Sequence, residues 1–277
     1  MDGLLLDGRY RVGPRIGSGG MSVVHEAEDL RLSRKLAIKL IRGESSDEVV
    51  ERLFREARAA ARANHAAVVT VFAYGTDQAT GLHYLAMERL HGEDLAARIA
   101  RHGPLPLELV LRLGIDIADA LGAVHATGVV HRDLKPSNVF LARRGVHVDD
   151  VKLLDFGVAK QIDLHTLTAP GEIIGTLLYM APEQLTDPKH VDARSDLYAL
   201  GALLYESLTA RAPFEDVALA ELGARILYSD PADLASLRRD VPPPLAAIVH
   251  KCLARRARDR YPSALRVRDA LIEARDG

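Results

Sequence analysis

The stretch His131-Arg132-Asp133-Leu134-Lys135-Pro136-Ser137-Asn138 places a carboxylate, an ammonium and an amide within six positions, from Asp133 to Asn138. It is short and charge-dense, and it directly follows the apolar pair Val129-Val130. Transfer of a phosphoryl group needs a residue that orients the attacking hydroxyl, a cation for the phosphate and an oxygen ligand for Mg²⁺. Asp133, Lys135 and Asn138 supply these three groups, which favours phosphoryl transfer over an ordinary solvated loop.

The composition of the whole chain is that of a soluble globular protein. Its 277 residues are 48% hydrophobic and 27% charged, which suits one large domain or two lobes. The formal net charge of −2 argues against nucleic-acid binding, because nucleic-acid-binding proteins usually carry a basic excess. The single cysteine, Cys252, allows no internal disulfide, and no apolar run approaches the roughly 20 residues that span a bilayer. We therefore expect a cytoplasmic protein with no membrane contact within this chain.

The hydrophobic pattern changes once along the chain. Residues 9–88 contain short β-type runs, including 68–72, with one helical segment at about 48–63. We expect later helices at about 107–127, 194–209, 216–228, 244–254 and 263–275, and short strands near 139–142 and 151–154. The pattern predicts an α+β chain with a small β-rich lobe (about 8–88), a junction at about 88–93 and a larger, mainly helical lobe (about 94–275). Clefts between such lobes are favoured ligand sites.

Two residues indicate where helices end or begin. Gly128 follows the helical pattern of 107–127, and a left-handed glycine commonly closes a helix. Ser263 follows Pro262 and is the expected N-cap of the last helix, because a serine hydroxyl can accept a hydrogen bond from the first turn.

A glycine-rich stretch, Gly17-Ser18-Gly19-Gly20, lies between two β-type runs. Glycines let a loop pass closely over phosphates with its N–H groups exposed. Taken alone, the stretch fits a simple hairpin turn equally well. The segment after it is β-like rather than helical, which argues against a dinucleotide-binding turn.

Three further charged residues indicate a functional site only when they are considered together. Lys39 closes the apolar run Leu36-Ala37-Ile38, and a buried ammonium needs an acidic partner, for which Glu56 in the helical segment is a candidate. Asp155, in Asp155-Phe156-Gly157, follows an apolar strand and could bind Mg²⁺. Each of these side chains, taken singly, is more often an exposed surface group.

Two more motifs concern the helical lobe. Glu183, in Ala181-Pro182-Glu183, is a candidate partner for a buried arginine, and Arg260 is the obvious one. Asp196 opens an apolar helix, so it could cap that helix or reach back to hold the backbone of the loop at 131–138.

The order of these motifs resembles the signature set of protein kinases, since each occurs once and in the order of that family. The chain is similar to the eukaryotic-like bacterial serine/threonine protein kinases, in particular to mycobacterial receptor-type kinases. The resemblance covers roughly residues 8–275 and implies a single protein kinase domain, 1–277, with the bilobal protein-kinase fold. Ser22 stands where the family's third loop glycine is usual.

The resemblance implies a role for each matching residue. Lys39 is expected to bind the α- and β-phosphates of ATP and to pair with Glu56, while Asp133 orients the acceptor hydroxyl. Lys135 is expected to contact the γ-phosphate, and Asn138 and Asp155 to hold Mg²⁺ or Mn²⁺. The other expected ATP contacts begin with Ile16, Gly17, Ser18, Gly19 and Gly20, where the backbone around Gly17, Gly19 and Gly20 is expected to cover the phosphates. They continue with Val24, Ala37 and Phe140 around adenine, Met87 as gatekeeper, Glu88 and Leu90 in the hinge, and Asp94 at the ribose.

The resemblance also implies protein substrates with serine or threonine acceptors. Lysine two residues after the catalytic aspartate, together with Thr176, is typical of serine/threonine kinases. The segment between Asp155 and Glu183 corresponds to the activation segment, and we expect autophosphorylation at Thr166 and Thr168. Self-association through the N-lobe or during phosphorylation in trans is a further expectation.

Two alternatives stay open at this point. A pseudokinase, which would bind ATP as a scaffold, is expected to lack Lys39, Asp133 or Asp155, and all three are present. A small-molecule kinase of similar fold is expected to lack the Ala-Pro-Glu segment and usually the loop lysine, and both are present here.

Overall fold

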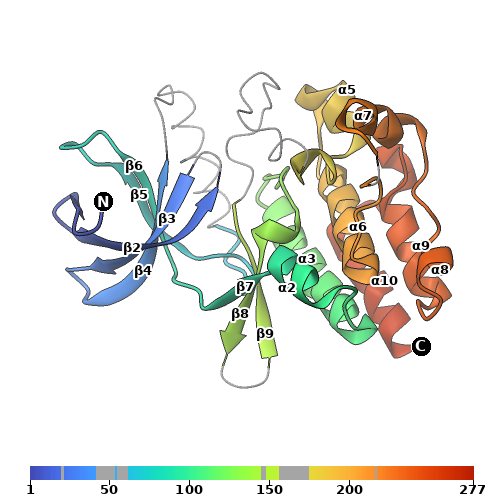
Figure 1. Cartoon of the computed structure of the whole chain (residues 1–277), viewed down its shortest axis with the longest axis horizontal. Helices are drawn as coiled ribbons and strands as arrows, with labels where there is room; N and C mark the ends of the chain where they lie inside the picture. The colour runs from blue at the N-terminus through green and yellow to red at the C-terminus, as the bar shows by residue number, and fades with distance from the viewer. Residues whose placement is uncertain (20–21, 42–53, 55–61, 145–147, 156–174, 216) are drawn as a thin grey trace.

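The computed structural model describes residues 1–277 apart from 20–21, 42–53, 55–61, 145–147, 156–174 and 216. Figure 1 shows a sheet-rich lobe that contains the N-terminus and a larger helical lobe that ends at the C-terminus. This arrangement confirms the α+β, two-lobed fold predicted from the hydrophobic pattern. None of the described helices is long and apolar enough to cross a bilayer.

The N-terminal lobe (N-lobe) is built on an antiparallel sheet with the strand order β1-β2-β3-β4-β6-β5. One face forms the core of this lobe: alternate side chains along β3 are buried, and Ala27 belongs to this core. The other face carries Val24 and Lys39, which are directly paired across β3 and β4. The strands are β1 (Leu5–Leu6), β2 (Tyr10–Gly19), β3 (Ser22–Asp29), β4 (Arg34–Ile41), β5 (Val71–Thr76) and β6 (His83–Met87).

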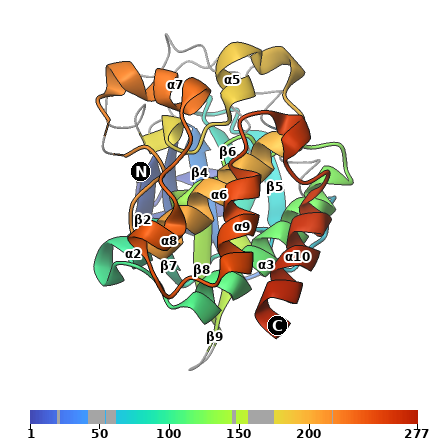
Figure 2. The same cartoon turned by 90° about the vertical axis from the view of Figure 1, so that its right-hand side faces the viewer.

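The C-terminal lobe (C-lobe) begins with a small antiparallel sheet, β7-β8-β9, which lies between the large sheet and the helices (Figure 1). Helix α6 is buried along nearly its whole length because it packs against α3, α9 and α10 (Figure 2). The elements are β7 (Gly92–Asp94), α2 (Leu95–His102), α3 (Leu107–His125), η1 (Pro136–Asn138), β8 (Val139–Arg144), β9 (Val148–Leu153), α5 (Pro182–Thr186), η2 (Pro188–His190), α6 (Arg194–Thr209), α7 (Leu219–Tyr228), α8 (Leu234–Leu237), α9 (Pro243–Cys252), η3 (Ala257–Asp259) and α10 (Ala264–Asp276).

Some predicted boundaries need correction. Helix α3 ends at His125 rather than at residue 127, and Gly128, with φ of 80°, closes the turn that follows it. The β-type run at 68–72 becomes a strand only from Val71, because Val68 instead forms an isolated parallel bridge with Leu153. Ser263 does cap α10, since its side chain accepts a hydrogen bond from the Arg266 N–H.

The packing of α6 against α9 is close. A Cβ atom on Gly201 would lie 2.7 Å from the Cβ of Cys252, so the two helices approach at a position that only glycine can occupy. Cys252 is fully buried there, as expected of a core residue, and burial raises the pKa of its thiol to about 12.

Candidate active site

The loop at 131–138 is held from behind by Asp196, a residue of α6. The carboxylate of Asp196 accepts hydrogen bonds from the backbone N–H groups of His131 and Arg132, both at 2.8 Å. It also accepts one from His125 Nε2 at 2.7 Å, and it is only 1% exposed. Arg132 has a φ of 61°, a left-handed conformation that is unfavourable for a residue with a Cβ. Of the two roles open for Asp196, the structure supports the one in which it holds this loop.

The three polar side chains predicted to act together do converge. The Asn138 Nδ2 group donates to the Asp133 backbone carbonyl at 2.7 Å and to Asp133 Oδ2 at 3.0 Å. Lys135 Nζ lies 3.2 Å from Asp133 Oδ2 and 3.3 Å from Thr176 Oγ1. Asp133 is thereby fixed between an amide and an ammonium, and the same ammonium lies beside the Thr176 hydroxyl.

The same hydrogen bonds orient Asn138 for a second task. A carbonyl and a carboxylate are acceptors, so the side of the amide facing Asp133 must be Nδ2, and Oδ1 is left to face elsewhere. The backbone carbonyl of Asn138 accepts from the N–H of Leu154 at 2.8 Å, which brings Asn138 beside Asp155. An amide oxygen and a carboxylate are donors that Mg²⁺ prefers, so this pair fits a magnesium site completed by phosphate oxygens and water.

Asp155 connects the two lobes through Lys39. Lys39 Nζ donates to Asp155 Oδ1 at 2.5 Å. The surrounding protein shields the partly exposed Asp155 from some of its water, which alone would raise its pKa, but the positive charge of Lys39, with smaller contributions from His131 and Lys135, lowers that pKa below the usual value. Asp155 is therefore ionised at neutral pH. Glu56, the expected partner of Lys39, lies outside the described residues.

Two of the residues expected to contact adenine, Val24 and Ala37, lie on the face of the sheet that carries Lys39. Ala37 on β4 is paired with Met87 on β6, and Val24 on β3 is paired with Gly17 on β2. Ile16 on β2 is 48% exposed, so its side chain is accessible to a ligand. Ser18 and Gly19 continue β2, while Gly20 lies outside the described residues.

The connection between the lobes runs from Glu88 to Asp94 and depends on a glycine. Gly92 has a φ of 149°, and a Cβ atom there would lie 2.0 Å from the carbonyl oxygen of Leu141. Leu90 is part of this connection, and Phe140 on β8 is paired with Asp94. The Asp94 side chain accepts from the Ala97 N–H at 2.8 Å and caps α2, so its role at the ribose stays a prediction.

The end of the activation segment is fixed by an ion pair that the sequence predicted. Arg260, whose side chain is fully buried, donates to both carboxylate oxygens of Glu183 at 2.6 and 2.8 Å. Sequence reasoning missed Gln184, whose side chain accepts from the Ala181 N–H and donates to the Arg132 carbonyl. No local pattern marks such a contact, because its partners lie 52 positions apart. Thr166 and Thr168 lie outside the described residues.

A half-buried acidic group, Glu206, lies beside the same segment. The hydroxyl of Tyr179 donates a hydrogen bond to Glu206 of α6. Burial raises the pKa of Glu206, the bond from Tyr179 lowers it, and the nearby Glu215 raises it further, so that the net shift is upward. The sequence contains no spacing that predicts this pair.

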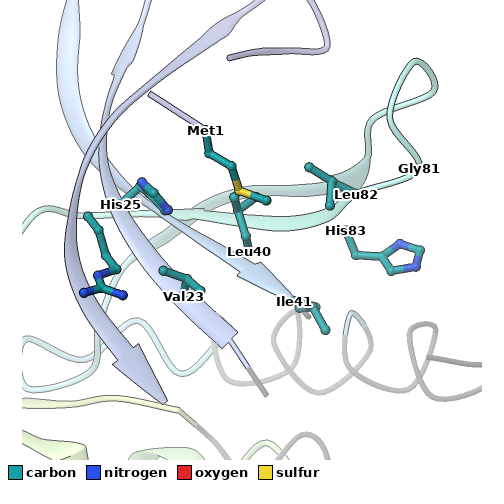
Figure 3. A pocket seen from close by; sticks show the side chains of 9 residues that line it. Met1, Val23, His25, Leu40, Ile41, Gly81, Leu82 and His83 are labelled. Atoms are coloured by element: carbon teal, nitrogen blue, oxygen red, sulfur yellow. The ribbon is translucent and has the colours of Figure 1, made fainter. Parts of the chain in front are cut away.

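A surface pocket of about 440 Å³ lies elsewhere on the N-lobe (Figure 3). Its lining includes Val23, His25 and Leu40, which alternate along their strands with the residues expected to contact ATP. It therefore opens on the opposite face of the sheet from Val24 and Lys39, and it contributes nothing to the site described above.

Comparison with known proteins identifies the class. The model of a family described as the protein kinase domain matches residues 10–270. The chain belongs to the protein kinase family. Serine/threonine-protein kinase PknL of Mycobacterium tuberculosis is 36% identical over 268 residues, which cover 96% of this chain and 65% of PknL. Serine/threonine-protein kinase Pkn1 of Myxococcus xanthus is 39% identical over 267 residues, covering 95% of this chain and 38% of Pkn1.

The chain thus spans less than two thirds of the length of these two curated relatives. Among solved structures, the PknI kinase domain of M. tuberculosis matches with a TM-score of 0.77 and 27% sequence identity, covering 99% of this chain and 98% of that chain. The family and the fold expected from the sequence motifs are therefore confirmed.

Proposed function

We propose that this kinase domain transfers the γ-phosphoryl group of MgATP to serine and threonine hydroxyls of proteins. The observation that carries the proposal is the convergence of Asp133, Lys135, Asn138 and Thr176 beside the Lys39–Asp155 pair. Those groups match the needs of phosphoryl transfer, which asks mainly for positioning and charge neutralisation. The serine/threonine kinases among the relatives support the same acceptor class.

Each residue has a defined task in this reaction. The acceptor hydroxyl, held by Asp133, attacks the γ-phosphorus while the bond from that phosphorus to the β–γ bridging oxygen breaks, and ADP leaves. The hydroxyl proton passes to the Asp133 carboxylate. Lys135 and Lys39 offset negative charge on the phosphates. Asn138 and Asp155 would hold Mg²⁺, which supplies further charge neutralisation when bound.

Phosphate incorporation by wild type and by Asp133→Asn tests the proposal. We expect MgATP to raise the melting temperature of both proteins, and only the wild type to label a generic basic protein substrate. Loss of a positioned acid–base group typically costs about 10²–10⁴-fold in rate. Equal labelling by both proteins would contradict the role of Asp133. MgATP binding by a wild type that labels no substrate would favour the pseudokinase alternative.

We further propose that the kinase phosphorylates Thr166 and Thr168 in its own activation segment, with one molecule acting on another. A phosphate brings nearly two negative charges, and Arg132, beside the catalytic aspartate, is a candidate partner for it. The initial rate of self-labelling should then rise with the square of protein concentration. Mass spectrometry of active enzyme that finds both threonines unmodified would contradict this assignment. Dependence on ATP makes the cytoplasm the proposed location.

A further inference from the structure

Glu88 combines two functions in the connection between the lobes. Its backbone belongs to the hinge segment expected to meet adenine, and its N–H donates to the Thr70 carbonyl at 2.9 Å. Its side chain turns back into the protein. There a single oxygen, Oε1, accepts from Lys152 Nζ at 2.6 Å and from the Thr70 N–H at 2.8 Å. The Glu88 side chain is 24% exposed and that of Lys152 only 14%, so this is a partly buried ion pair.

Lys152 lies on β9, the strand that leads to Asp155. The next residue, Leu153, donates from its N–H to the Ala67 carbonyl at 2.7 Å and accepts from the Val69 N–H at 3.1 Å. Segment 67–70 therefore lies between Glu88 and β9 and is hydrogen-bonded to both.

Segment 67–70 is itself fixed to the C-lobe. His65, two residues before this segment, makes the connection, because its Nε2 lies 3.0 Å from Asp119 Oδ2 on α3. Asp119 in turn accepts from Arg268 of α10 at 2.5 Å. Through Glu88, the hinge is therefore connected to the C-lobe, the lobe that also carries Asp155.

We propose that the Glu88 carboxylate is a positioning residue that sets the hinge backbone relative to Asp155, and so aligns bound ATP with its metal ligands. The inference rests on the proposed kinase function. Adenine would be held by the backbone of the hinge and the phosphates by Asp155 through Mg²⁺. The distance between the hinge and Asp155 therefore determines how well one ATP molecule can make both sets of contacts. Charge-assisted hydrogen bonds are the strongest available in a protein and are suited to fixing such a distance.

Glu88→Gln separates this role from simple packing. The amide oxygen of glutamine can still accept from Thr70, whereas Lys152 loses its carboxylate. We expect the KM for ATP to rise about three-fold or more, with a smaller change in kcat. Lys152→Met should give a similar rise, and the double variant should differ little from either single variant, because all three remove the same interaction. Lys152→Arg preserves the charge and should keep the KM for ATP near that of wild type.

The matched control is Glu28→Gln, which breaks an exposed ion pair with Arg11 on the same lobe, at 3.4 Å. It should leave the KM for ATP within two-fold of wild type. Melting temperatures, measured in parallel, show which variants are folded, and kinetics are compared only among folded variants. Unchanged KM for ATP in both Glu88→Gln and Lys152→Met, or a rise in Lys152→Arg equal to that in Lys152→Met, would overturn the proposal.

The dissociation constant for MgATP, measured without any acceptor, separates this inference from the function on which it rests. A wild type that binds MgATP but labels no protein would refute the kinase function alone. The Glu88 inference would then be decided by the dissociation constants. Weaker binding by Glu88→Gln and Lys152→Met, with Lys152→Arg like wild type, supports it. Equal binding by all four proteins overturns it.

Discussion

The two halves of the candidate active site are held in place in different ways. The loop at 131–138, which the proposed function makes the catalytic loop, is fixed from inside the C-lobe, where the buried Asp196 accepts hydrogen bonds from two of its backbone N–H groups. In the described structure, Lys39 on the N-lobe meets this half of the site through its ion pair with Asp155, whose side chain is 44% exposed. The first half is therefore preformed by packing and buried hydrogen bonds. The second depends on how the two lobes are arranged.

This difference separates stability from activity. Damage to the supports of the catalytic loop should affect both, because those supports also belong to the C-lobe core. Damage to the Lys39–Asp155 pair should affect activity almost alone, because partly exposed ion pairs contribute little to folding.

The largest expected effect is that of Asp196→Ala. It leaves the backbone N–H groups of the buried His131 and the half-buried Arg132 without their acceptor, and it removes the partner of His125. We expect the free energy of unfolding to fall by about 3–5 kcal/mol. We also expect kcat to fall by at least about 100-fold, since the proposed role of Asp133, to orient the acceptor, requires that residue to stay in place. Urea denaturation and steady-state kinetics measure the two effects. An unchanged kcat would show that the loop keeps its shape without Asp196.

Lys39→Met should break only the interlobe half of the site. The side chain keeps its apolar stem but loses its charge, so we expect about a 100-fold or greater loss of phosphate transfer. The melting temperature without ATP should move by less than about 3 °C. Differential scanning fluorimetry beside a kinase assay tests both expectations. A large drop in melting temperature would mean that the Lys39–Asp155 pair is a structural support after all.

Glu183→Gln is expected to have the reverse effect, on stability more than on activity. Arg260 would keep its bonds to three backbone carbonyls but lose its carboxylate, and the amide nitrogen of glutamine would face one of its N–H groups. We expect a loss of about 2–3 kcal/mol in the free energy of unfolding. The kcat per folded molecule should stay within about five-fold of wild type. A loss of kcat equal to that of Asp196→Ala would place Glu183 among the supports of the catalytic loop.

The smallest effect concerns pH and Glu206. Because the folded-state pKa of Glu206 is raised above its unfolded value, the folded protein binds the extra proton more readily, and stability increases as the pH falls through the folded-state pKa. Glu206→Gln carries no charge at any pH. It should be more stable than wild type at pH 7, by about 1 kcal/mol or less, and this advantage should shrink toward pH 4.5. Melting curves of both proteins across this range would reveal an advantage that fails to shrink.

Much of the fold follows from hydrophobic spacing. The bounds predicted for α6, about 194–209, are those observed. The helix is apolar on nearly all sides, and Asp196 in its first turn accepts a hydrogen bond from the buried N–H of His131. Boundaries set by turn geometry were less predictable. Helix α3 ends earlier than predicted because the Thr127 hydroxyl and N–H both bond to the Val124 carbonyl, which starts the turn before Gly128 is reached.

The contacts of the candidate site also differ in how well the sequence predicts them. Residues within one loop, such as Asp133, Lys135 and Asn138, could be grouped from the sequence because their spacing is short. The contact of Glu88 with Lys152 joins residues 64 positions apart, and that of Gln184 with Arg132 joins residues 52 apart. Neither leaves a periodic pattern, because each depends on how separate strands and helices meet in space. Long-range contacts between common residue types are therefore what sequence reasoning misses.

The close approach of α6 and α9 has a practical consequence. Cys252 is the chain's single thiol, and with its pKa raised to about 12 it is almost wholly protonated at neutral pH and shielded from reagents. Alkylation can then proceed only when these two helices separate. The rate at which an excess of iodoacetamide labels the protein therefore measures how often the C-lobe core opens. Mass spectrometry detects this labelling as a single mass increase, and the measurement requires no nucleotide.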